Sequence, residues 1–232
     1  GDITLRKGVF KLAPLRLGVI GGRADITTEI DLVNSPEKLK LSGTAAGLKL
    51  QTILELFGLD LAASGVFSGW FDVAGILTPD KSFENTLSGR AALSLDQGRI
   101  ATAMLDLAGL GVVPWLFSKE RAQGYTDLVC VFAPLTLRPG QIHTRNAALE
   151  TARVRVLVNA DASWANNSIA LRAVPISKRS ATGRSPFPVT MTGMLNSPTI
   201  SVAKSSDTLL GLSGHQSVAP EFTQPCRVSA QQ

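Results

Sequence analysis

The feature that most constrains this chain is a succession of short segments between Gly124 and Ala203 that alternate apolar and polar residues and are separated by Pro-Gly, Asn and Ser clusters. In the segment 153–162, Val154, Val156 and Val158 fall on one side of an extended chain, and Arg153 and Arg155 fall on the other. A period of two is typical of a β-sheet with one apolar and one polar face. The alternation predicts six strands, joined by short turns into a β-meander: Thr126–Leu137, Gln141–Leu149, Arg153–Ser163, Ser168–Ile176, Phe187–Leu195 and Thr199–Ala203.

The first half of the chain carries the same alternation, interrupted by a few helical patterns. Strands are expected over Ile3–Leu41, Leu61–Leu77 and Arg90–Gln97, with Gly65, Gly69 and Gly75 read as turns or bulges. Apolar residues at helical spacing before a closing glycine predict a helix within Gly47–Gly58, and Thr78–Gly89 carries capping signals for a second. The apolar run Ile100–Phe117 is interrupted by Asp106 and Pro114, which favours two short helices over a membrane span.

These patterns predict a mostly β protein of the α+β class. We expect a long twisted antiparallel meander sheet that is curled into a groove, with a few short amphipathic helices capping or flanking it. Residues 1–204 are expected to form one domain, with sub-halves near 1–123 and 124–204. Residues 205–232 lose the periodicity and are predicted to form a flexible tail.

Charge is distributed unevenly along the chain. Between Arg138 and Lys204 there are nine basic residues but only two acidic ones, Glu150 and Asp161. Such a cationic segment suits anionic lipid headgroups or nucleic acid, and it is equally compatible with simple solubility. Nucleic acid is disfavoured as a partner because aromatic side chains are not interleaved with the arginines.

The residues that usually carry catalysis or bind metals are sparse in this chain. His143 is an ordinary strand residue, His215 lies in the tail, and neither has a ligand neighbour at metal-binding spacing. Cys130 and Cys226 form no metal or redox motif, and for Cys226 a free thiol and a bridge to Cys130 both stay open. Asn166-Asn167-Ser168 matches a glycosylation acceptor and also a hairpin turn. No catalytic residue, cofactor or metal is therefore expected.

The order of these pieces resembles the C-terminal region of the AsmA family, bacterial envelope proteins related to the bridge-like lipid-transfer proteins. The resemblance covers about residues 5–205. It rests on the succession of seven degenerate motifs: Leu48–Gly58, the strands around Gly65–Gly75, Phe83–Gly89 running into Arg90–Ile100, the apolar helical stretch, Asp127–Gly140, the strand pair Arg153–Ile176, and Val189–Pro198. The tail with Cys226 departs from the family pattern.

The resemblance implies a non-enzymatic protein of Gram-negative bacteria. Its periplasmic β-groove would serve phospholipid transport between the inner and outer membranes and outer-membrane biogenesis. The chain starts at Gly1-Asp2 without a leader, so we expect a processed or excised piece whose inner-membrane anchor, an N-terminal helix, is absent.

An apolar sheet face needs a cover of helices, another sheet, a partner or a ligand. The predicted helices are short and few, so we expect acyl chains to cover part of this face. The candidate groove residues are Val154, Val156, Val158, Ile169 and Leu171, and the candidate headgroup contacts are Arg153, Arg155, Arg172, Lys178 and Arg179. The alternative is an assembly factor with a closed dry core, which binds outer-membrane or other envelope proteins by edge pairing.

Overall fold

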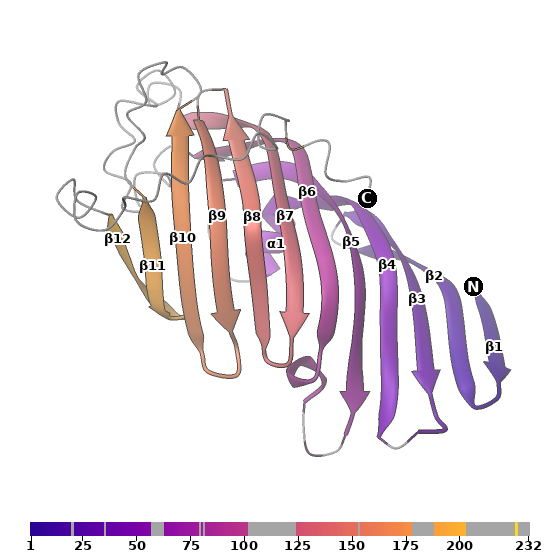
Figure 1. Ribbon diagram of the computed structural model, residues 1–232. Coiled ribbons are helices and arrows are strands. Elements are labelled where there is room, and N and C mark those ends of the chain that lie inside the picture. The colour runs from indigo at the N-terminus through magenta and orange to yellow at the C-terminus, as the bar shows by residue number, and fades with distance from the viewer. Residues whose placement is uncertain are drawn as a thin grey trace.

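In the part of the chain that it describes, the computed structural model is a single twelve-stranded antiparallel sheet in which each strand pairs with its neighbours in sequence (Figure 1). The structure describes residues 1–202, apart from 20, 35, 57–62, 79, 81, 102–123, 153 and 178–187, together with Cys226. The strands are β1 Asp2–Arg6, β2 Val9–Val19, β3 Gly22–Asp31, β4 Glu37–Lys49, β5 Ala63–Leu77, β6 Ser88–Ala101, β7 Tyr125–Arg138, β8 Gln141–Thr151, β9 Val154–Ser163, β10 Ser168–Ser177, β11 Val189–Met194 and β12 Ser197–Val202.

The sheet is twisted and curved rather than flat (Figure 1). Ladder irregularities accompany this curvature, for example between Leu12 and Leu15 of β2, between Ala45 and Leu48 of β4, and between Thr144 and Ala147 of β8. Such bulges bend a strand and increase its twist. The prediction of a long twisted meander with little helix is confirmed.

The two ends of the sheet differ in their connections. The turns β1–β2, β3–β4, β7–β8, β9–β10 and β11–β12 share one end with the 3₁₀ helix η1, Phe83–Asn85, and we call it the η1 end. The helix α1, Leu50–Leu56, joins β4 to β5 at the opposite end, which we call the α1 end. In Figure 1 the η1 end points down and α1 lies behind the sheet.

Of the helices expected from sequence, one is confirmed and one is corrected. α1 lies within the predicted segment Gly47–Gly58. The second predicted helix, Thr78–Gly89, is wrong in extent, because only Phe83–Asn85 is helical and Ser88 already begins β6. The Thr86 hydroxyl accepts the Ile76 N–H at 2.9 Å, which ties the chain back to β5 and ends the helical turn. The expected helices within Ile100–Phe117 lie almost entirely outside the described residues.

The hairpin predicted at Asn166–Ser168 is confirmed. β9 and β10 are joined by a turn over residues 164–167, in which Asn167 has a positive φ of 48°. Asn tolerates this left-handed conformation better than most residues. Among the described residues, no helix has the length and apolar character needed to cross a membrane.

Candidate functional site

One side of the sheet is apolar across nearly its whole width, and we call it the apolar face. The cross-strand register places Ile26, Gly43, Phe71, Ala91 and Leu135 in one row that runs from β3 to β7 on this side. Every strand from β2 to β11 contributes to it, with one representative from each being Leu12, Ile26, Leu41, Phe71, Leu93, Val131, Leu149, Val156, Leu171 and Met191. The alternation seen in the sequence therefore produces one continuous surface.

The candidate groove residues meet on the apolar face. Val154, Val156 and Val158 alternate along β9, while Ile169 and Leu171 of β10 pair with Ala162 and Ala160 of β9. Val154 is buried at 1% exposure, and the other four are half-buried. The structure therefore places all five predicted residues on one side of the sheet, where Val154 is already covered; their role as groove residues stays a prediction.

The described helical elements cover only part of the apolar face. α1 contacts β4 and β5, and η1 contacts β5. Leu93 of β6, which projects from this face between those strands and β7, is still 40% exposed, and Leu17 of β2 is 38% exposed. Most of the other large side chains named above for the apolar face are half-buried rather than buried. The exposed aliphatic side chains therefore lie in separate places on this face, on β2 and β6, while Val73, Leu95 and Val154 are buried. Exposed apolar patches are a feature of surfaces that bind a partner or a ligand.

Glycines within the strands leave space on the apolar face because they carry no side chain. A Cβ on Gly43 would lie 3.1 Å from Phe71 Cζ, and a Cβ on Gly69 would lie 3.0 Å from Leu93 Cδ2. Each glycine therefore makes room for a large side chain of the neighbouring strand to lie over it. The interpretation of Gly75 as a turn or bulge is wrong, because it lies in a regularly paired part of β5, whereas Gly65 adjoins a register shift towards β6 and Gly69 adjoins one towards β4.

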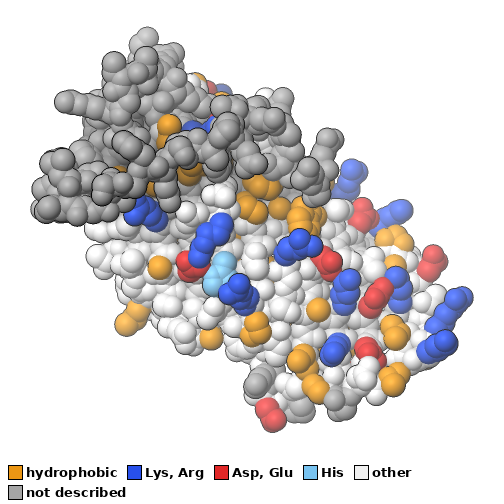
Figure 2. Space-filling model, in the orientation of Figure 1, with side chains coloured by type: hydrophobic (Ala, Val, Ile, Leu, Met, Phe, Trp, Pro, Cys, Tyr) orange, Lys and Arg blue, Asp and Glu red, His pale blue; other side chains and the backbone are white. Residues whose placement is uncertain are grey.

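The opposite side of the sheet is charged, and we call it the charged face. Oppositely charged neighbours pair across strands on it: Lys11–Glu29 at 2.6 Å, Arg16–Asp25 at 3.4 Å, Lys40–Asp72 at 3.5 Å and Arg99–Asp127 at 3.0 Å. The Lys11 hydrogen bond lowers the pKa of Glu29. Figure 2 shows this side, with basic and acidic side chains intermingled. Such exposed pairs keep the surface solvated and contribute little stability.

The two headgroup candidates that the structure describes, Arg155 and Arg172, do not share a site. Arg172 is exposed and lies on the charged face, opposite Asn159 and Thr190 in the neighbouring strands. Arg155 forms an ion pair with Glu150, and their side chains are only 16% and 3% exposed. This guanidinium is therefore engaged inside the protein. Arg153, Lys178 and Arg179 lie outside the described residues.

The second acidic residue of the basic segment is also paired. Both carboxylate oxygens of Asp161 accept hydrogen bonds from Arg145, at 2.7 and 2.9 Å, and one accepts the His143 Nδ1–H at 2.6 Å. These bonds, Arg145 first, lower the pKa of Asp161. Sequence spacing missed this cluster because His143 and Asp161 meet only through the β8–β9 register.

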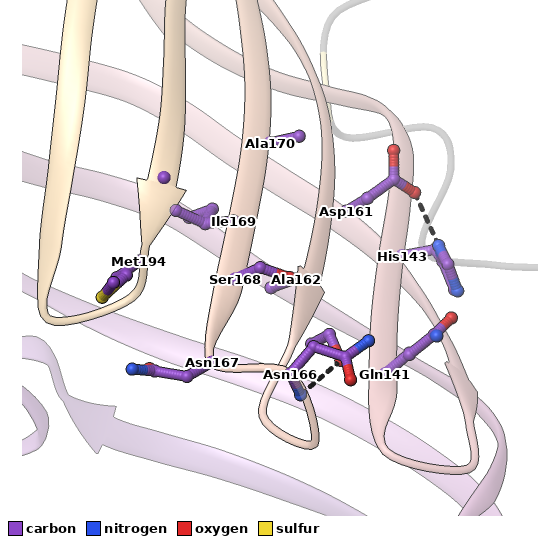
Figure 3. Close-up of a pocket in the computed structure, with 12 residues that line it drawn as sticks. Gln141, His143, Asp161, Ala162, Asn166, Asn167, Ser168, Ile169, Ala170 and Met194 are labelled. Atoms are coloured by element: carbon purple, nitrogen blue, oxygen red, sulfur yellow. Dashed lines mark hydrogen bonds and ion pairs between the residues drawn. The ribbon is translucent and has the colours of Figure 1, made fainter.

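This cluster borders a concavity of ≈ 530 Å³ near the β9–β10 turn, which Figure 3 shows with Gln141 and Asn166 beside the imidazole. A catalytic His–Asp pair needs a nucleophile within hydrogen-bond reach of the free ring nitrogen. His143 Nε2 is buried and has no hydrogen-bond partner among the described residues. His143, Arg145 and Asp161 therefore form one hydrogen-bonded network across β8 and β9.

A disulfide links Cys130 of β7 to Cys226, with the two Cα atoms 6.0 Å apart. Of the alternatives that the sequence left open, the bridge is the one found. Glu150 Oε2 lies 3.6 Å from Cys130 Sγ, so these three residues form a group with the composition of a metal site. Both sulfurs are already bonded to each other, and a disulfide sulfur offers no thiolate to a metal.

The fold and its apolar face define a class of protein: an antiparallel meander sheet that is amphipathic from β2 to β11. No protein-family model, curated protein or solved structure matches the chain. The AsmA resemblance therefore rests on the order of motifs in the sequence alone.

Proposed function

We propose that the apolar face binds the acyl chains of phospholipids. The observation that carries the proposal is that apolar residues of β2 to β11 share one side of the sheet, where Leu17 and Leu93 stay 38% and 40% exposed although Val73, Leu95 and Val154 are buried. A ligand that covers such a surface must itself be apolar and extended. Acyl chains meet both conditions, and each CH₂ moved out of water contributes ~0.8 kcal/mol.

The dimensions of the sheet suit lipids. Twelve strands spaced by about 4.8 Å give a width of roughly 53 Å, and the fifteen residues of β5 give a length of roughly 50 Å before curvature. These dimensions allow more than one lipid to lie on the face. The charged face would stay in water, while the headgroups would leave the apolar face at the ends of the strands.

The headgroup contacts are proposed at the α1 end. The β8–β9 connection contains Arg153 and the β10–β11 connection contains Lys178 and Arg179, and both connections join strands at that end. Arg155 is left out of this proposal because Glu150 already engages its guanidinium. Arg172 is left out because it lies on the charged face.

Within the cell we propose a non-enzymatic role in the envelope of a Gram-negative bacterium. The motif order that resembles the AsmA family supports a periplasmic segment of an inner-membrane-anchored protein. Such a segment would support phospholipid transport between the inner and outer membranes and outer-membrane biogenesis. No nucleic acid and no cofactor take part in this proposal.

The test is to measure the lipid that purifies with the protein. Purified chain would be extracted with organic solvent, and phospholipid per protein would be quantified by mass spectrometry. Leu93→Gln places an amide on the apolar face and is expected to lower the amount of bound phospholipid several-fold. The matched control is Val9→Gln, since Val9 is 37% exposed but lies on the charged side, between Arg6 and Asp31.

Two outcomes would overturn the proposal. One is reproducible absence of phospholipid from the wild-type protein, both as purified and after incubation with phospholipid vesicles. The other is an equal loss of lipid in Leu93→Gln and Val9→Gln, since a ligand on the apolar face must distinguish the two sides of the sheet.

The edge strand β1 favours a second candidate function, binding of envelope proteins by edge pairing. Ile3 and Leu5 are 67% and 66% exposed, and the outer edge of β1 is unpaired among the described residues. An extended segment of another protein would add there as a further strand. Deletion of residues 1–6 would abolish capture of such a partner while leaving bound phospholipid unchanged, and loss of lipid without loss of partner would contradict this assignment.

A further inference from the structure

The connection between β5 and β6 folds back over the apolar face. A Cβ on Gly75 of β5 would lie 2.5 Å from Phe83 Cε2 and 3.1 Å from Phe83 Cδ2. Gly75 belongs to the apolar side, because it continues the series Phe71, Val73 along β5 and pairs with Leu39 of β4. The phenyl ring of Phe83 therefore covers the η1 end of this part of the apolar face.

The ring is held in place by hydrogen bonds at the end of η1. The Thr86 hydroxyl oxygen accepts a hydrogen bond from the Ile76 N–H at 2.9 Å. Two carbonyl oxygens can accept the hydroxyl proton: that of Phe83 at 2.8 Å and that of Ile76 at 3.1 Å. The Thr86 N–H also donates to the Phe83 carbonyl at 2.9 Å. Because one threonine fixes both the strand and the turn, the position of Phe83 is determined before any ligand arrives.

The absence of a side chain on Gly75 is required for this arrangement. A contact of 2.5 Å with a ring carbon is closer than a Cβ tolerates, and Gly75 is itself buried. An alanine at this position would have to displace the ring and also the Thr86 hydroxyl, whose oxygen would lie 2.9 Å from the new Cβ. The glycine and the phenylalanine therefore act as one unit, although eight positions separate them in the sequence.

The ring sets a length along β5. From Phe67, which pairs with Leu48 near α1, to Gly75 there are eight residue steps, or roughly 26 Å of extended chain. On this stretch Phe67 and Phe71 are half-buried and Val73 is buried at 9% exposure, and Phe83 closes it at the η1 end. A chain that lies along the strand would meet the ring there.

We propose that Phe83 is a stop that limits the length of the acyl chain lying along β5, and that Gly75 provides its seat. This inference rests on the proposed function, since it names a length limit for the same ligand. It makes Phe83 a specificity-determining residue, and it predicts that removing the ring extends the apolar floor.

The experiment measures relative affinity for saturated fatty acids of twelve, sixteen and twenty carbons, by competition against a fluorescent fatty acid. The variants are Phe83→Ala, which removes the ring, Gly75→Ala, which displaces it, and Phe83→Leu, which keeps an apolar stop. Leu32→Ala is the control, because Leu32 is a 55% exposed apolar residue in the β3–β4 connection at the same end of the sheet.

Phe83→Ala and Gly75→Ala are expected to raise the preference for the twenty-carbon acid over the twelve-carbon acid, by about four-fold for each additional CH₂ that becomes buried. Phe83→Leu is expected to keep most of the wild-type preference, and Leu32→Ala all of it. Circular dichroism spectra first show whether Phe83→Ala and Gly75→Ala fold. If one of these two variants does not fold, the other one carries the comparison.

Two failures are distinguishable. If Phe83→Ala and Gly75→Ala bind fatty acids with the wild-type length preference, the stop is refuted while acyl binding stands. If the wild-type protein binds none of the three acids, the proposed function fails, and with it the length limit.

Discussion

The buried ion pair between Arg155 and Glu150 gives the sharpest stability prediction. Their side chains are 16% and 3% exposed, whereas the surface pair Lys11–Glu29 is 47% and 37% exposed. Removing one partner of a buried pair leaves the other charge without its counter-charge in a medium that solvates it poorly. Such a change typically costs about 3–5 kcal/mol, against about 0.2–1 kcal/mol for an exposed pair.

The perturbation is therefore Arg155→Met, compared with Lys11→Met. We expect Arg155→Met to lower the free energy of unfolding by about 3–5 kcal/mol, which corresponds to roughly 6–20 °C in Tm for a chain of this size. Lys11→Met should lower Tm by no more than a few degrees. For both variants, urea denaturation followed by circular dichroism measures the free energy of unfolding, and thermal denaturation measures Tm, with the disulfide kept oxidised.

A double variant separates the ion pair from simple packing. In Glu150→Met/Arg155→Met both charges are absent, so stability should return to within about 2 kcal/mol of wild type, or exceed it. The reasoning is refuted if Arg155→Met stays within about 1 kcal/mol of wild type. If Arg155→Met keeps its stability but loses bound phospholipid, Arg155 is a headgroup contact and not a structural cation.

Three further predictions follow from the described contacts. Leu95→Ala, at a side chain only 1% exposed, should destabilise the protein by about 2–5 kcal/mol, measured by urea denaturation; a loss below about 1 kcal/mol would mean that the site is not packed as described. Because Arg145 and His143 lower the pKa of Asp161 below 3.8, its stabilising contribution is present above that pH and is lost as the pH falls through the folded-state value. Thermal unfolding of Asp161→Asn should accordingly differ from wild type at pH 7 and converge with it below about pH 3.8, and a constant difference would contradict this assignment. Cys226→Ser opens a loop of 96 residues and should lower stability by about 2–5 kcal/mol, as dithiothreitol should in the wild type but not in the variant.

The sequence alone determined most of the sheet. Alternation over 153–162 predicted a strand with Val154, Val156 and Val158 on one face, and β9 has this form. The prediction succeeds because the pleat of an extended chain turns successive side chains to opposite sides, whatever lies around them. Turn residues add to it, since Asn167 and Gly140 take the positive φ values that end strands.

What the sequence did not determine is which distant residues meet. His143 reaches Asp161, 18 residues away, only because β8 and β9 pair in a particular register beyond the bulge between Thr144 and Ala147, whereas Glu150 and Arg155 are five residues apart across the connection of the same two strands. An inserted residue in one strand shifts every later cross-strand partner, and the alternation pattern does not fix where that shift occurs.

The same reason explains the glycines and the disulfide. Gly75 looks like a turn in the sequence, but in the sheet it is the position where Phe83 lies down on the apolar face. Cys130 and Cys226 are 96 residues apart, and only the folded chain brings their sulfurs together. Local pattern determined the strands and their two faces, because the pleat is a property of neighbouring residues. The tertiary structure decided the contacts across the apolar face, because these depend on the register of the whole sheet.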